Sequence, residues 1–81
     1  MKVRIIISLK KGVLDTQGKA IENSLVKNLV FPQVSQVRQG KVIEVEISET
    51  DPEQIKITID DICDKLLVNK VIEDYSYEVI G

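Results

Sequence analysis

The chain has 81 residues, of which 43% are apolar and 30% charged, and a formal net charge of −2. A chain this short cannot divide its apolar residues between two cores, so we expect a single domain over residues 1–81. Its apolar runs fall short of a membrane span, and we expect no signal peptide. The single cysteine, Cys63, cannot close a disulfide within the chain, which is consistent with a reducing, cytoplasmic location.

The charges are divided unevenly along the chain. Residues 1–41 hold eight Lys or Arg and two acids, whereas residues 42–81 hold three Lys and eleven acids. This division is typical of one basic and one acidic surface, suited to contacts with a partner or with a second copy. Two solvated faces that merely differ in sign would give the same pattern, so both interpretations stay open.

The chain opens with a predicted strand and a glycine-flanked loop. Residues 2–9 place Val3, Ile5, Ile7 and Leu9 on one face, and Ile6 adds an apolar group to the other. The loop that follows reads KKGVLDTQGKA over residues 10–20. Its two glycines and three lysines suggest phosphate binding at a helix start, but neither the P-loop nor the dinucleotide-binding glycine spacing is present.

A helix is predicted to follow the loop. Asp15 or Thr16 is its candidate N-cap, because either side chain can accept hydrogen bonds from the first free amides. We expect it to stop by about Val30, since Pro32 disfavours helical geometry at the residue before it. The spacing of its apolar residues predicts a buried stripe formed by Ile21, Leu25 and Leu29.

Two further strands are predicted around Gln39-Gly40. Residues 34–38 and 42–48 flank this dipeptide, and Gly40 permits a positive φ at little cost. Together they are interpreted as a β-hairpin, which would supply the second and third strands.

The acidic half begins with a helix-start signal in residues 50–54, where Pro52 follows a capping Asp51. The next apolar residues fit a helical stripe better than a strand, which leaves Ile57 off the stripe and partly exposed. Asn69 is a candidate left-handed terminator, and residues 71–80 alternate as a last strand. The residues of the helical stripe are Ile55, Ile59, Ile62, Cys63, Leu66 and Leu67.

The predicted order is therefore β-α-β-β-α-β. This order predicts an α+β fold of ferredoxin-like type, with an antiparallel sheet and both helices on one of its faces. The crossovers through the helices would be right-handed.

The sequence offers little catalytic chemistry. It contains no histidine, so neither a Ser-His-Asp nor a Cys-His arrangement can form within the chain. Cys63 lies on the predicted core stripe, where a thiol usually serves packing. The neighbouring acid pairs Asp60-Asp61 and Glu73-Asp74 point in different directions, and no metal site is predicted.

The fold order alone leaves several binding functions to weigh. RNA-recognition domains need aromatic residues on their central strands, and the first and third predicted strands have none. An acylphosphatase-like enzyme would need an arginine in the loop after the first strand, where this chain has only lysines. A ligand-binding regulatory module of the ACT type shares the fold and remains an alternative.

Three blocks carry a more specific resemblance, and they span essentially the whole chain. They read LKKGVLDTQGKA over residues 9–20, VRQGKVIE over 37–44 and CDKLLVNKVIEDY over 63–75. In these blocks the chain resembles the PurS-type small subunit of phosphoribosylformylglycinamidine synthase (FGAM synthase). It departs from that family at Lys11, Thr16 and Lys70, where proline is usual.

The resemblance implies a subunit of a glutamine-dependent, ATP-consuming ligase that has no catalytic, cofactor-binding or metal-binding residues of its own. Its partners would be a large synthetase subunit, which uses ATP and Mg²⁺, and a glutaminase subunit. The small subunit would join them, assist ammonia transfer in the fourth step of purine synthesis, and self-associate as a dimer or tetramer. Neither nucleic acid nor membrane would be a partner.

The candidate partner-docking residues lie in the glycine-flanked loop and just before the predicted third strand. A basic patch of this kind would steer and orient an acidic partner surface. The residues are Lys10, Lys11, Gly12, Asp15, Gln17, Gly18, Lys19, Arg38 and Lys41.

Overall fold

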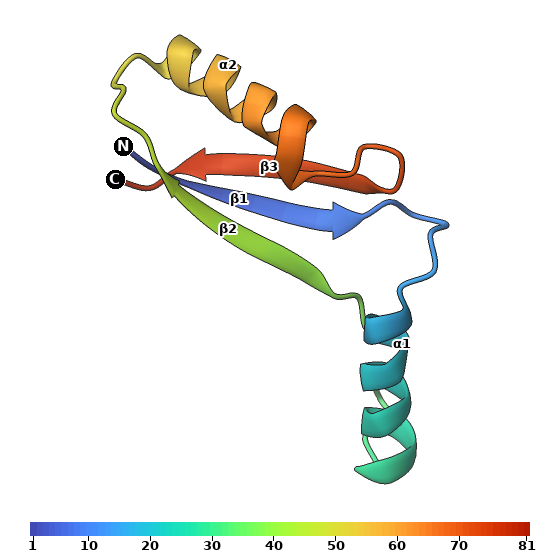
Figure 1. Cartoon of the computed structure of the whole chain (residues 1–81). Helices are drawn as coiled ribbons and strands as arrows, with labels where there is room; N and C mark the ends of the chain where they lie inside the picture. Colours follow the sequence, from blue (N-terminus) through green and yellow to red (C-terminus); the bar gives the residue numbers. More distant parts are fainter.

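The computed structural model describes all 81 residues as a three-stranded antiparallel sheet, one helix packed on it and a helical arm that stands away from it (Figure 1). The strands lie in the order β2-β1-β3, and the predicted α+β class with an antiparallel sheet is confirmed. Both helices end in a π-helical turn, η1 or η2. The elements are β1 (Lys2–Leu9), α1 (Thr16–Asn23), η1 (Ser24–Asn28), β2 (Gly40–Glu46), α2 (Pro52–Ile62), η2 (Cys63–Leu67) and β3 (Glu73–Val79).

The central strand β1 supplies the middle of the core. Its alternate side chains Val3, Ile5 and Ile7 point towards α2, as the two-residue period of a strand requires. Ile5 lies opposite Ile43 of β2 and Tyr77 of β3, which pack at the edges of the same layer. The fully enclosed core has seven residues: Val3, Ile5, Ile7, Ile55, Ile59, Cys63 and Val68.

The helix α2 forms where the sequence predicts it. Asp51 caps it, because its carboxylate accepts a hydrogen bond from the Glu53 N–H at 3.0 Å. Ile55, Ile59 and Cys63 recur every four residues along one face and are buried, as predicted. Leu66 was placed on the same stripe wrongly, since it is 82% exposed. Ile57 lies off this face and is 59% exposed, which confirms that it falls outside the stripe. Neither helix of the chain is long and apolar enough to cross a membrane.

The predicted hairpin is wrong in its first half. Residues 34–38 form no strand, and β2 pairs with β1 instead, from Lys2 opposite Glu46 to Ser8 opposite Gly40. Gly40 does not have a positive φ; it begins β2, where an added Cβ would lie 2.6 Å from the Ile7 carbonyl oxygen. The sequence pattern missed this because close approach of two backbones, and not a turn, requires the glycine.

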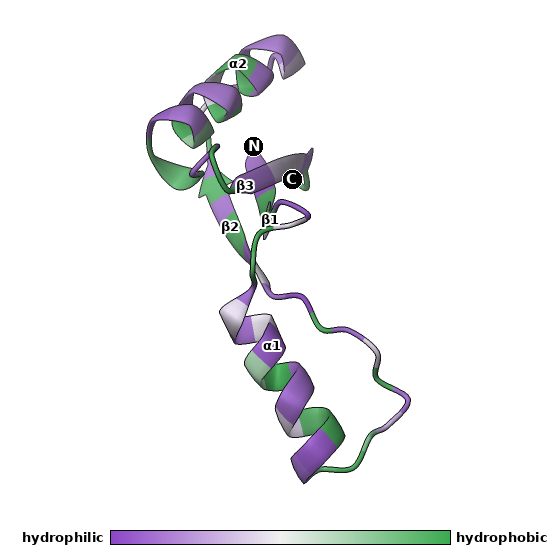
Figure 2. Ribbon diagram, turned by 90° about the vertical axis from the view of Figure 1, so that its right-hand side faces the viewer, coloured by the Kyte–Doolittle hydropathy of each residue, from purple (hydrophilic) through white to green (hydrophobic).

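The arm, which we define as residues 16–39, does not cover the sheet, so only α2 lies on it. Figures 1 and 2 show α1 projecting from the end of the sheet, with the chain returning beside it. Gly18 is the only buried residue of α1, and the predicted stripe of Ile21, Leu25 and Leu29 contributes nothing to the core. The radius of gyration is therefore 16.2 Å, against roughly 12 Å for a compact domain of this length.

The helix terminators also differ from the prediction. Asn69 does not adopt a positive φ, and η2 ends instead when Val68 becomes extended. The left-handed residue is Val30, with φ 59°, at the tip of the arm. There the Phe31 N–H donates to the Leu25 carbonyl, six residues back in the chain, at 2.8 Å, and this bond closes the tip of the arm. The helical segment stops at Asn28, in agreement with the predicted end by about Val30.

Val30→Gly should therefore stabilise the tip of the arm. A β-branched residue is strained at positive φ by roughly 1–2 kcal/mol, part of which glycine's larger unfolded-state entropy offsets. We expect a net gain of about 1 kcal/mol, seen as roughly fivefold slower hydrogen exchange of the Phe31 amide. Leu29→Gly is the matched control: Leu29 has φ −101°, so exchange should become faster. Equal effects of the two substitutions would contradict the strain at Val30.

Candidate functional site

The base of the arm is held by one carboxylate. Asp15 is only 6% exposed, and its Oδ1 accepts the Gly18 N–H at 2.8 Å while Oδ2 accepts the Gln39 N–H at 2.6 Å. The first bond caps α1, and the second ties the start of α1 to the residue before β2. The hydrogen bonds from the Gln39 and Gly18 amides hold the pKa of Asp15 below its ordinary value.

Gly18 is required by this arrangement. A Cβ at this position would lie 2.5 Å from Asp15 Oδ2 and 2.6 Å from the Val37 carbonyl oxygen. Two of the nine candidate docking residues, Asp15 and Gly18, are therefore buried parts of the frame and are not available to a partner directly.

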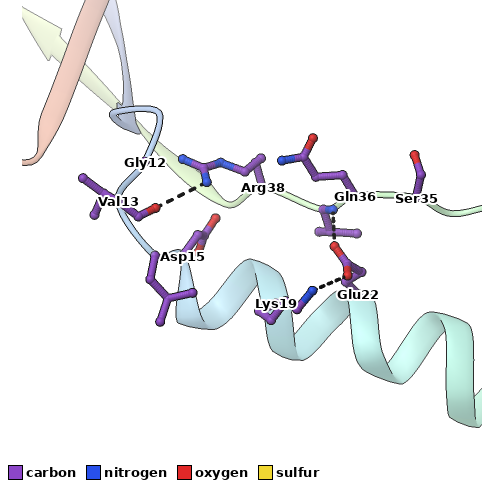
Figure 3. A pocket seen from close by; sticks show the side chains of 10 residues that line it. Gly12, Val13, Asp15, Lys19, Glu22, Ser35, Gln36 and Arg38 are labelled. Carbon is purple, nitrogen blue, oxygen red and sulfur yellow. Dashed lines mark hydrogen bonds and ion pairs between the residues drawn. The ribbon is translucent and has the colours of Figure 1, made fainter.

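Arg38 holds the loop that precedes α1 (Figure 3). Its guanidinium donates to the carbonyl oxygens of Leu9 at 3.2 Å, Lys10 at 3.3 Å and Val13 at 3.4 Å. Three carbonyls of one loop thus share one cation, which suits the fork of donors that arginine presents. Arg38 belongs to the predicted set, but its contacts are to its own chain.

Two residues that the sequence reasoning did not select complete the base. Glu22 accepts the Val37 N–H at 3.2 Å and pairs with Lys19 at 2.9 Å, so it joins α1 to the returning segment. The Gln39 side chain hydrogen-bonds Gln17. The sequence held one clue to Glu22. It and Asp15 are the only acids in residues 1–41, and both accept hydrogen bonds from backbone amides.

The candidate lysines differ in how far their charges are neutralised. Lys10 pairs with Asp74 at 3.3 Å, and Lys41 pairs with Glu73 at 3.6 Å, both from β3. Lys19 pairs with Glu22, whereas Lys11 makes no ion pair. The structure thus brings the acidic start of β3 close to Lys10 and Lys41. Among the candidate lysines, Lys11 alone makes no ion pair.

A turn displays Lys11. The Val13 N–H donates to the Lys10 carbonyl at 3.2 Å, which closes a β-turn with Lys11 and Gly12 at its centre. Gly12 has φ +86°, the left-handed conformation that glycine adopts without strain. Lys11 therefore stands at the exposed corner of the turn.

Grooves flank the base of the arm. One of about 650 Å³ is open between α1, the loop and residues 35–38. A second, of about 290 Å³, lies where Leu14 and Gln17 approach Lys41 and Glu73. No buried side-chain nitrogen or oxygen of the chain lacks a hydrogen-bond partner.

The remaining reactive groups serve the packing of α2. Burial raises the pKa of the Cys63 thiol, which is fully enclosed in the core. The Tyr75 hydroxyl donates to Asp60 Oδ1 at 2.8 Å, and this bond raises the pKa of Tyr75 to about 12. No group of three or more Cys, Asp or Glu side chains is placed to hold a metal ion.

Comparison with known proteins identifies this architecture. Residues 2–81 match the family model PurS, described as phosphoribosylformylglycinamidine (FGAM) synthase. The chain belongs to the PurS family.

Known PurS proteins match this chain over nearly its full length. It is 42% identical over 78 residues to the phosphoribosylformylglycinamidine synthase subunit PurS of Bacillus subtilis, covering 96% of this chain and 90% of that one. The B. subtilis PurS crystal structure has a TM-score of 0.85 at 40% identity and covers 99% of this chain and 98% of that one. A chain in the structure of PurLQS from Thermotoga maritima has a TM-score of 0.85 at 31% identity, with 95% and 93% covered.

Lys11, Thr16 and Lys70, where the resemblance implied proline, lie at positions that suit proline. Lys11 is the second residue of the turn described above. Lys70 has the same place in a turn closed by the Ile72 N–H and the Asn69 carbonyl at 3.0 Å. Thr16 is the first residue of α1, where a missing N–H costs nothing. The PurS fold therefore retains its turns here without the rigidity of proline.

The Asp15 contacts predict a pH dependence local to the arm. Because its folded pKa is depressed, the contribution of Asp15 is present above the unfolded carboxyl value of about 4. It is lost as the pH falls through the lower folded pKa. We expect the Gly18 and Gln39 amide resonances to shift together in an NMR titration over this acidic range. In Asp15→Asn the two amides should show no such step, and a retained step would assign it to another acid.

Proposed function

We propose that this chain is the PurS subunit of FGAM synthase and acts in purine biosynthesis without catalytic residues of its own. The observation that carries the proposal is the match to PurS proteins over nearly the full length of both chains. The composition supports it, because a glutaminase needs a histidine beside its cysteine and this chain has none.

The role would be assembly. In the complex, a glutaminase subunit releases ammonia from glutamine, and a large synthetase subunit uses ATP and Mg²⁺ to convert the amide of its ribonucleotide substrate into an amidine. The small subunit joins the two and helps to confine the ammonia between them, in the cytoplasm. A similar chain is present in the structure of PurLQS from Thermotoga maritima, which supports this role.

The docking surface would lie at the base of the arm. Asp15, Gly18 and Arg38 shape this region from within, and the loop turn displays Lys11 above it. Charges that the base holds in fixed places would orient a partner more than they would raise its binding affinity. The proposed docking residues are Lys10, Lys11, Gly12, Gln17, Lys19, Arg38 and Lys41, with Asp15 and Gly18 as the buried frame beneath them.

Reconstitution tests the assembly role. The chain would be mixed with the large synthetase subunit and the glutaminase subunit, and glutamine-dependent amidine formation measured. We expect activity to require the chain, because it supplies the contact between the two larger subunits. A parallel assay with added ammonia separates loss of ammonia transfer from loss of synthetase chemistry. Equal glutamine-dependent rates with and without the chain would overturn the assembly role.

Lys11→Glu tests the docking surface. Lys11 makes no ion pair in its own chain, so reversal should act on the partner and leave folding intact. We expect assembly to weaken by roughly 3- to 10-fold at low salt, and by less at high salt, where exposed charges are screened. Lys65→Glu makes the same charge change on η2 and serves as the control. Equal affinities for the two variants would move the docking surface away from the loop.

A further inference from the structure

Two neighbouring acids at the start of β3, Glu73 and Asp74, pair with lysines of the proposed docking surface from opposite faces of the sheet. Figure 1 shows the start of β3 at the same end of the sheet as the loop that follows β1. Glu73 lies opposite Leu9 of β1, and Asp74 lies opposite Ser8. Because successive residues of a strand point to opposite faces, Glu73 lies on the face that α2 covers and Asp74 on the open face.

Glu73 is held firmly by two partners. Its side chain is only 15% exposed, and its Oε2 lies 3.6 Å from Lys41 Nζ. Its Oε1 accepts a hydrogen bond from the Asn69 N–H at 2.8 Å. Glu73 therefore joins the turn before β3 to the start of β2, and it belongs to the frame of this end of the sheet.

Asp74 is held by one exposed ion pair. Its side chain is 67% exposed, and Lys10 Nζ, 3.3 Å from Oδ1, is its only polar partner. A pair of flexible, solvated side chains of this kind is weak and is readily replaced.

The backbone of Lys10 does not depend on this ion pair. The Lys10 N–H donates to the Ile72 carbonyl at 2.8 Å, and the Lys10 carbonyl accepts from the Val13 N–H at 3.2 Å and from Arg38 at 3.3 Å. The loop therefore keeps its shape whether or not Asp74 stays in place. What the Asp74 carboxylate changes is the charge that the loop displays.

The neighbouring residue, Lys11, makes no ion pair and is free to attract a carboxylate of a partner. A carboxylate that arrives there comes close to the Lys10–Asp74 pair, and two like charges brought together repel each other. We infer that Asp74 is an internal competitor for the docking loop: its carboxylate occupies Lys10 in the free chain, and a carboxylate of the partner replaces it on assembly.

This inference rests on the proposed docking surface and states the chemistry of the partner that fits it. The partner presents two carboxylates close together, one for Lys11 and one for Lys10. Until it binds, Asp74 leaves one unpaired cation at the turn in place of two, which weakens the attraction of unrelated polyanions.

Asp74→Asn tests the exchange, because it removes the charge and keeps the shape of the side chain. The chain is titrated into the large synthetase and glutaminase subunits, and the concentration that gives half-maximal glutamine-dependent activity is measured. We expect this concentration to fall roughly 2- to 5-fold at low salt, and to change little at high salt. Asp61→Asn is the matched control, since it frees Lys65 from an exposed pair of 3.0 Å on the helical layer and should have no such effect.

The same substitution in a Lys10→Gln chain locates the effect. Asp74 then has no lysine to neutralise, so most of the gain should be lost, and a gain of equal size would overturn the exchange. An unchanged or higher half-maximal concentration for Asp74→Asn alone would also overturn it. If Lys11→Glu still weakens assembly in that case, the docking loop itself stands. If neither Asp74→Asn nor Lys11→Glu alters assembly, the docking surface lies elsewhere and both proposals fail.

Discussion

The structure depends on the layer between β1 and α2. Three alternate residues of the central strand meet Ile55, Ile59 and Cys63, and with Val68 they are the buried apolar residues of the chain. Burial of each contributes about 1.5–3 kcal/mol, which is offset by the entropy of ordering the chain. A core this small can hold one sheet and one helix. Everything outside it, the arm included, must be fixed by polar contacts or by another molecule.

Polar contacts fix the arm at its base. The Asp15 carboxylate accepts hydrogen bonds from two backbone amides, and the Arg38 guanidinium donates to three backbone carbonyls. Without these two side chains, the groups at the helix start and in the loop would lack these hydrogen-bond partners. These residues lie within the segment first selected for its charge. They shape the loop, and Lys11 is left exposed at its turn without an ion pair. This division between a bonded frame and an exposed cation is consistent with the assembly role proposed above.

Several features were predictable from the sequence because they follow from local rules. The β1 and α2 patterns, the Asp51 cap, the burial of Cys63 and the exposure of Ile57 depend on periodicity and capping within a few residues. The loop stands out in the sequence as a distinct segment, since its glycine and charge spacing are visible there. The phosphate interpretation was not supported, because it required a spacing that the loop lacks.

What the sequence by itself determined is the class of fold and, through three blocks of residues, the PurS family. Only the tertiary structure decided that residues 34–38 leave the sheet, that Gly40 admits the Ile7 backbone and that Val30 takes a left-handed conformation at the tip of the arm. It also decided that α1 leaves its own sheet. An apolar stripe specifies that a helix must be covered, but not by which surface, because the hydrophobic effect has no direction and the bonds that aim the arm join residues far apart in the sequence.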